Sequence, residues 1–138
     1  MNINSTSCKD WLWGVNGHNH FYPAYPEEQL EEQIKLAAEL GVGIYRLNYT
    51  PTDEKMFAYL DKVIDACERY KLKLFLVAFD WDFINYENPK TLYSIAKSIA
   101  DRYRGHIYMY QVSNEQEIPS LLGFDNPESE VMNRYRYN

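Results

Sequence analysis

The chain has 138 residues, which is long enough for one domain with a hydrophobic core. Hydrophobic residues make up 46% of it and charged residues 25%, values that are ordinary for a globular protein and argue against general disorder. The net charge is -6 and the sequence has no basic patch, so we expect no nucleic-acid-binding surface.

The first ten residues form a polar tail, 1–10, without the charged-then-apolar order of a signal peptide. No apolar run approaches the length of a membrane span, so we expect no membrane insertion. Cys8 and Cys67 lie far apart and form no metal-ligand or redox motif. We therefore expect no metal and no other cofactor, and the sequence leaves the compartment open.

A strand pattern is followed by a helix pattern in the first third of the chain. The stretch 11–17, "WLWGVNG", is typical of a buried strand, and 26–41, "PEEQLEEQIKLAAELG", is typical of an amphipathic helix. Pro26 suits the first helical position, and Gly41 suits a left-handed stop.

The same two-part unit then recurs. A second strand is predicted at 43–49, followed by a helix capped by Thr52; a third strand at 72–79 precedes a helix that runs from Asn88-Pro89 to Gly105. The fourth strand is predicted at 106–113, and Asn126-Pro127-Glu128 marks the start of a further helix. The predicted core face of the second helix comprises Met56, Leu60, Val63, Ile64 and Cys67.

Four apolar strands that each precede a helix indicate an α/β fold with a parallel sheet. This pattern fits either an open doubly wound sheet or the first half of an eight-unit barrel. Neither GxGxxG nor GxxxxGK[ST] occurs in the sequence, which disfavours a nucleotide-binding sheet. Polar residues gather instead at the carboxyl ends of the strands, where barrel enzymes carry their chemistry: Asn16, His18, His20, Arg46, Asn48, Asp80, Asp82, Asn114 and Glu115.

Three stretches resemble the clan A glycoside hydrolases, which are (β/α)8 TIM barrels. They are "WGVNGHN" in the first unit, "YRLNY" in the second and "YQVSNEQE" in the fourth. The resemblance implies that residues 1–138 form the N-terminal half of a barrel domain, four βα units long. Residues 116–138 are then the loop after the fourth strand and a partial fourth helix.

The resemblance also implies roles for the site residues. Glu115 would be the general acid/base, Asn114 would bind the sugar 2-hydroxyl, and Arg46 would support the site and keep the nucleophile ionised. The nucleophile of the clan is a glutamate on a seventh strand, and we expect the chain to stop before it and to be inactive alone. Two departures from the common pattern, Gln116 in place of proline and "FDWDF" without a histidine after the third strand, leave the family within the clan open.

Four other residues are candidate carbohydrate contacts. Asn16 and His18 follow the first strand, and Asp80 and Trp81 follow the third. Aromatic rings stack on the apolar faces of sugars, and Trp81 is the best placed for this; Trp11 and Trp13 are expected in the barrel core. His18 and His20 have no third ligand nearby, so we predict no metal site.

The sequence therefore predicts a retaining glycosidase acting on a β-linked oligo- or polysaccharide. Two alternatives remain open: a non-catalytic carbohydrate-binding half-barrel, and a different TIM-barrel enzyme. The latter is weakened because Lys73 lies at the non-catalytic end of its strand. A half-barrel also exposes strand edges, so we expect self-association or a missing C-terminal half-barrel as partner.

Overall fold

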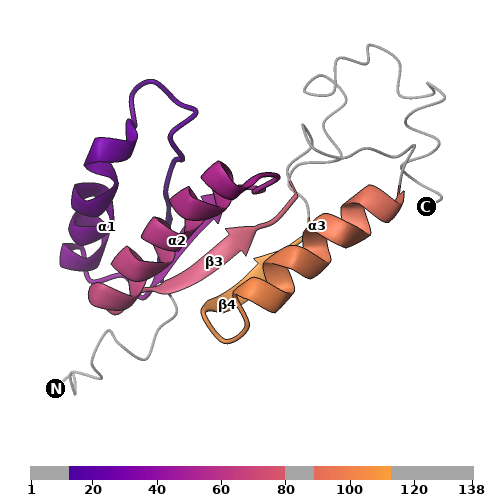
Figure 1. Ribbon diagram of the computed structural model, residues 1–138. Coiled ribbons are helices and arrows are strands. Elements are labelled where there is room, and N and C mark those ends of the chain that lie inside the picture. Colours follow the sequence, from indigo (N-terminus) through magenta and orange to yellow (C-terminus); the bar gives the residue numbers. More distant parts are fainter. Residues whose placement is uncertain (1–12, 80–88, 113–138) are drawn as a thin grey trace, which may run out of the picture.

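A computed structural model describes residues 13–79 and 89–112 of the chain (Figure 1). The predicted tail and the predicted segment after the fourth strand lie outside the described residues. The elements in chain order are β1 (Gly14–Asn16), the 3-10 helix η2 (Glu27–Gln29), α1 (Leu30–Glu39), β2 (Ile44–Asn48), α2 (Glu54–Arg69), β3 (Lys73–Val77), α3 (Pro89–Arg102) and β4 (Ile107–Gln111).

The four strands form one parallel sheet in the order β1-β2-β3-β4. Each strand therefore pairs with the next strand in the sequence. The helix between two strands returns the chain to the same end of the sheet, so that the next strand runs parallel to the last. This is the predicted succession of βα units, of which the described residues contain three strand–helix pairs and the fourth strand. Strands β2 and β3 are each shorter than the predicted strands 43–49 and 72–79.

The three α-helices lie on one face of the sheet (Figure 1). The apolar stripe of each helix packs on the strand side chains of that face in a single core. On α1, Leu30, Ile34 and Ala37 are buried, as the periodicity predicted. On α2, the predicted stripe is buried from Leu60 to Cys67, and this burial raises the pKa of the Cys67 thiol to about 12.

The helix ends agree with the sequence in part. Gly41 and Gly105 adopt positive φ values of 78° and 86°, as expected for left-handed positions after a helix. The cap of α2 differs from the prediction, because Asp53 and not Thr52 is the N-cap residue. The Asp53 carboxylate accepts a hydrogen bond of 2.9 Å from the backbone N–H of Met56, while the Thr52 hydroxyl donates to the Met56 sulfur.

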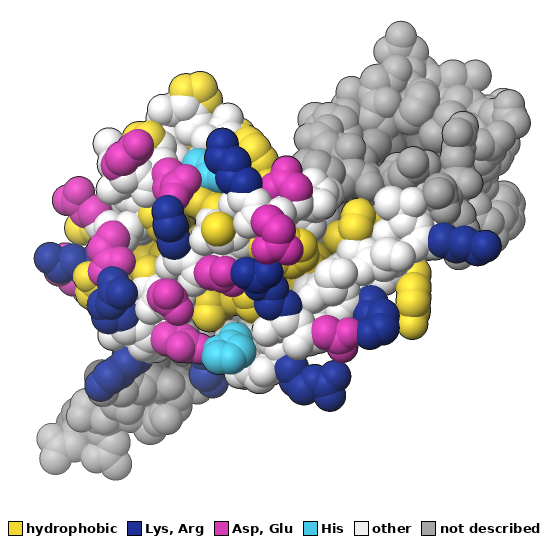
Figure 2. Space-filling model, viewed as in Figure 1, with side chains coloured by type: hydrophobic (Ala, Val, Ile, Leu, Met, Phe, Trp, Pro, Cys, Tyr) yellow, Lys and Arg dark blue, Asp and Glu magenta, His cyan; other side chains and the backbone are white. Residues whose placement is uncertain are grey.

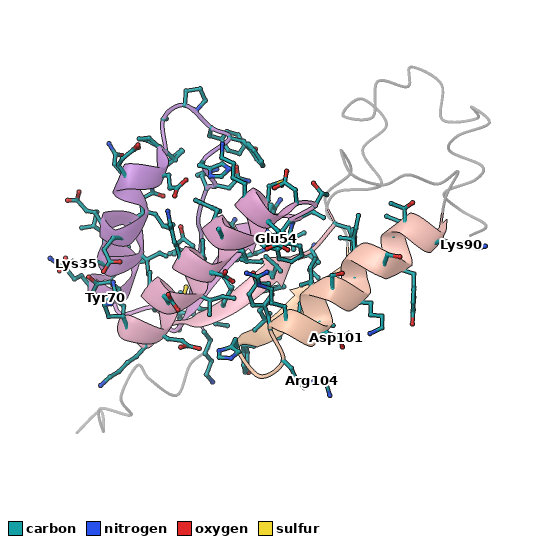
Figure 3. All side chains as sticks on the ribbon, in the orientation of Figure 1. Lys35, Glu54, Tyr70, Lys90, Asp101 and Arg104 are labelled. Atoms are coloured by element: carbon teal, nitrogen blue, oxygen red, sulfur yellow. The ribbon has the colours of Figure 1, made fainter. Side chains whose placement is uncertain are left out.

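Charged side chains of both signs cover the outer surface of the helices (Figure 2). Several, including Lys35 on α1 and Arg104 after α3, point away from the ribbon (Figure 3). Between α2 and α3, Asp61 accepts hydrogen bonds from Arg102 at 2.6 Å and from the Tyr103 hydroxyl at 2.8 Å. No helix of the described ranges is long and apolar enough to cross a membrane.

One expectation about burial was wrong: Trp13 was predicted in the barrel core, but 59% of its surface is exposed. On the fourth strand, Tyr108, Met109 and Tyr110 each remain more than 40% exposed. Trp13 immediately precedes edge strand β1, and the other three residues belong to edge strand β4. A side chain at an edge is buried only where another element covers it.

Candidate active site

Arg46 is the centre of the polar cluster on the sheet face away from the helices. Its neighbours on β2, Tyr45 and Leu47, pack in the helix-covered core, so strand alternation directs Arg46 to the opposite face. Its guanidinium Nη1 donates to the Asn16 Oδ1 at 3.2 Å. On its other side, Nε and Nη2 donate to one oxygen, Oε1 of Gln111, at 3.3 and 3.1 Å.

The strand register brings these residues together. Asn16 of β1 pairs with Arg46 of β2, and Arg46 pairs with Phe75 of β3. The Phe75 ring centroid lies 5.8 Å from the guanidinium carbon, within the range of a cation–π contact. Gln111 stands opposite Val77, two residues beyond Phe75 on the same face of β3.

The Arg46 side chain joins the two outer strands of the sheet. Its guanidinium contacts Asn16 on β1, the adjacent strand, and Gln111 on β4, which lies two strands away on the other side.

Within the described residues, the Arg46 guanidinium donates to two neutral amide side chains. A fixed positive charge favours the ionised form of a carboxylate placed near it. The site lies toward the carboxyl ends of the strands, where Asn16 and Gln111 are the last residues of β1 and β4. Its chemistry therefore suits a group that anchors and orients an acidic side chain or an anionic ligand.

The structure brings two of the seven predicted site residues together, Asn16 and Arg46. His18 instead stacks on Tyr25 within its own loop, with ring centroids 4.4 Å apart, and meets the edge of Tyr22 at 5.0 Å. The remaining four lie outside the described residues, and their roles stay predictions: Asp80, Trp81, Asn114 and Glu115.

Sequence reasoning missed Gln111 as a site residue. It is a polar residue within the predicted strand 106–113, four positions before Glu115 in the sequence. A polar residue in that largely apolar run was the available signal. It was weak because the partner, Arg46, is 65 residues away in the sequence.

A second missed residue is Asn19, which fixes the loop after β1. Its side chain is 8% exposed; Nδ2 donates to the backbone oxygen of Asn48 at 2.7 Å, and Oδ1 accepts from the backbone N–H of Phe21 at 2.9 Å. His20 then packs on the Tyr59 ring of α2 at a centroid distance of 4.0 Å. The loop is thus anchored to the end of β2 through Asn48 and to α2 through Tyr59.

Gly17 provides the space that the aromatic ring of Tyr45 occupies. A Cβ atom on Gly17 would lie 2.0 Å from the Tyr45 ring and hydroxyl, so no larger residue fits without movement. The Gly17 N–H also donates to the Arg46 carbonyl at 2.8 Å, which extends the pairing of β1 with β2. Burial raises the pKa of the Tyr45 hydroxyl well above its usual value.

The residues in the described ranges include no group of three histidine, cysteine, aspartate or glutamate side chains that could hold a metal ion. No protein-family model matches the sequence, and no curated protein matches it.

Solved structures do match. A psychrophilic β-glucosidase from Micrococcus antarcticus aligns with a TM-score of 0.63 and 16% identity, over 76% of this chain and 26% of that one. A β-glycosidase, BGL167, aligns with a TM-score of 0.65 and 18% identity over 82% of this chain and 38% of its own. A rice β-glucosidase mutant in a covalent complex with Glc aligns with a TM-score of 0.62 and 15% identity, over 72% and 25%.

These matches show the fold. The described strands and helices resemble part of the TIM barrel of these β-glycosidases, as the sequence predicted. The chain spans between about a quarter and two fifths of the length of these three structures. With identities of 15 to 18%, the likeness concerns architecture and does not extend to a shared reaction.

Proposed function

We propose that this chain carries the acid/base half of a retaining glycoside hydrolase that cleaves O-glycosyl bonds in a β-linked oligo- or polysaccharide. The observation that supports the proposal is the placement of Arg46 between Asn16 of β1 and Gln111 of β4, near the carboxyl ends of four parallel strands. In the sequence, Asn114 and Glu115 follow within four residues of Gln111, the last residue of β4.

In the proposed mechanism, Glu115 is protonated when substrate binds. It transfers its proton to the glycosidic oxygen as the bond between that oxygen and the anomeric carbon breaks. Asn114 bonds to the sugar 2-hydroxyl, where contacts strengthen in the transition state. Asn16, His18, Asp80 and Trp81 are proposed to contact the sugar as well.

We assign no nucleophile to this chain. A retaining site needs a second carboxylate about 5–5.5 Å from the first, and the clan places it on a seventh strand. Under this proposal the remaining half-barrel is a partner of the chain, and Arg46 orients the carboxylate that this half supplies. The chain alone then lacks turnover of an unactivated glycoside.

An external nucleophile tests the proposal on the chain itself. Sodium azide can replace the second carboxylate by attacking the anomeric carbon of phenyl β-D-glucoside, so that α-glucosyl azide forms as phenol leaves with the Glu115 proton. Glu115 regains its proton from water. Because phenolate is a poor leaving group, we expect azide-dependent phenol release to fall about 100-fold or more in Glu115→Gln.

Glu117→Gln is the matched control, since it removes a carboxylate two residues away that has no assigned role. Products are identified by chromatography and the anomeric configuration by NMR. Equal phenol release from the unaltered chain and Glu115→Gln contradicts the acid/base assignment. Saturable binding of β-linked oligosaccharides without azide-dependent release points instead to the carbohydrate-binding alternative.

A further inference from the structure

We infer that Gln111 is a positioning residue: its side-chain amide oxygen fixes the orientation of the Arg46 guanidinium, and its neutrality adds no negative charge beside that cation. Its catalytic meaning rests on the proposed function, but its geometry does not. Gln111 lies in the stretch "YQVSNEQE", but it was not among the candidate site residues that the sequence pointed to.

The contacts of Arg46 fix its plane from three sides. Nε and Nη2 converge on Oε1 of Gln111, so both atoms that define one edge of the guanidinium share an acceptor. Nη1 is held from the opposite side by Asn16. The Phe75 ring lies under the guanidinium carbon. Rotation of the guanidinium about the Cδ–Nε bond or the Nε–Cζ bond breaks at least one of these contacts.

Gln111 also couples the two parts of the proposed site. Arg46 comes from β2, and the acid/base candidate Glu115 follows β4, the strand that ends at Gln111. A hydrogen bond between Arg46 and Gln111 therefore links the orientation of the cation to β4, the strand that precedes the proposed proton donor in the sequence. Asn16 performs the equivalent function toward β1.

The choice of an amide has an electrostatic consequence. Glutamate at position 111 would preserve the acceptor oxygen but would form a charge-assisted pair with Arg46. Its negative charge would also stand on the strand that leads to Glu115, and a like charge raises the pKa of a nearby carboxyl. Glutamine retains the geometry without this effect.

The test observes the Arg46 Nε–H group by nitrogen-15 NMR in the whole chain, with its signal assigned by its loss in Arg46→Lys. A hydrogen-bonded Nε–H exchanges slowly with water. We expect Gln111→Leu, which retains the approximate size and removes the acceptor, to speed this exchange about 10-fold or more. We expect Gln111→Glu to preserve slow exchange, and Gln29→Leu on η2 is the matched glutamine control.

The azide-dependent reaction gives the second readout. We expect Gln111→Leu to lower its rate about 10- to 100-fold through misplacement of Arg46. We expect Gln111→Glu to shift the pH dependence of the reaction to higher pH. Circular dichroism establishes that each variant is folded, and Gln111→Asn, whose amide is one methylene shorter, replaces Gln111→Leu if that variant unfolds.

The outcomes separate the two proposals. Unchanged exchange at Arg46 in the folded Gln111→Leu or Gln111→Asn variant overturns the positioning role, whatever the activity. Faster exchange in that variant with slow exchange in Gln111→Glu supports the role, even if the unaltered chain shows no azide-dependent turnover. In that last case the proposed function fails alone.

Discussion

The two faces of the sheet differ although the same strands form both. On β2, Tyr45 and Leu47 are 2% and 0% exposed and pack under the helices. Arg46, between them, lies on the other face and bonds to Asn16 and Gln111. Because successive side chains of a strand point in opposite directions, one segment serves stability and binding chemistry at once. Substitutions on the two faces should therefore have separate effects.

The largest loss of stability is expected from Leu47→Ala on the helix-covered face. The side chain is fully buried, and its removal leaves a cavity in the core, at a cost of about 2–5 kcal/mol in the free energy of unfolding. Leu40→Ala is the matched control, because Leu40 is 75% exposed and its loss should change this free energy by about 0.5 kcal/mol or less. Urea unfolding measures both; similar losses would contradict the assignment of the core.

Gly17→Ala tests the point where the core reaches the site. The new Cβ would overlap the Tyr45 ring, so we expect a loss of about 1–3 kcal/mol. Gly43→Ala is the control, since the nearest atom to a Cβ there is 3.9 Å away. In the double variant with Tyr45→Leu, the cost of the added methyl should shrink, as measured by a double-mutant cycle. Additive losses would show that the ring is not the obstacle.

Asp61→Asn tests a polar contact between α2 and α3. Burial alone would raise the pKa of Asp61, but hydrogen bonds from Arg102 and Tyr103 outweigh it and lower this pKa below 3.8. A depressed pKa in the folded state contributes stability above the unfolded pKa, and the contribution is lost as the pH falls through the folded value.

We expect Asp61→Asn to cost about 1 kcal/mol or less at pH 7, since the side chain is 41% exposed, and to cost progressively less as the pH falls below 3.8. Thermal unfolding between pH 7 and pH 2 measures the difference, with the exposed Asp65→Asn as control. A cost that stays constant across this range would show that the carboxylate charge is not involved.

The smallest effect on stability is expected from Arg46→Met, on the face without helices. The half-buried site lets water reach the two amides, so we expect a change of about 1 kcal/mol or less in the free energy of unfolding. The azide-dependent reaction should nevertheless be lost. A destabilisation as large as that of Leu47→Ala, measured by urea unfolding, would place Arg46 among the residues that hold the fold together.

Local features of the sequence predicted the fold for a physical reason. The spacing of Leu30, Ile34 and Ala37 matches one face of a helix, and an almost fully apolar run such as 72–79 suits a strand of a sheet covered by helices. The expectation for Trp13 was wrong because it did not depend on such local spacing. Burial of a side chain depends on which element covers it, and the hydrophobicity of the residue does not specify that element.

The site shows the same division. Arg46 and Asn16 were predicted because polar residues at strand ends are visible in the sequence. Gln111 was not, because its importance comes from a hydrogen bond to a residue two strands away. Thr52 and Asp53 differ for a related reason: both residues can cap a helix, and only the backbone conformation selects between them.

The sequence by itself determined the order of strands and helices, their apolar faces and the polar character of the strand ends, because these are properties of residue spacing along one segment. Only the tertiary structure decided which polar residues meet. Strand register sets Asn16 opposite Arg46, and the pairing of β2 with β3 and of β3 with β4 places Gln111 within reach of the same guanidinium. Such pairings depend on the positions of whole strands, and no short stretch of sequence contains them.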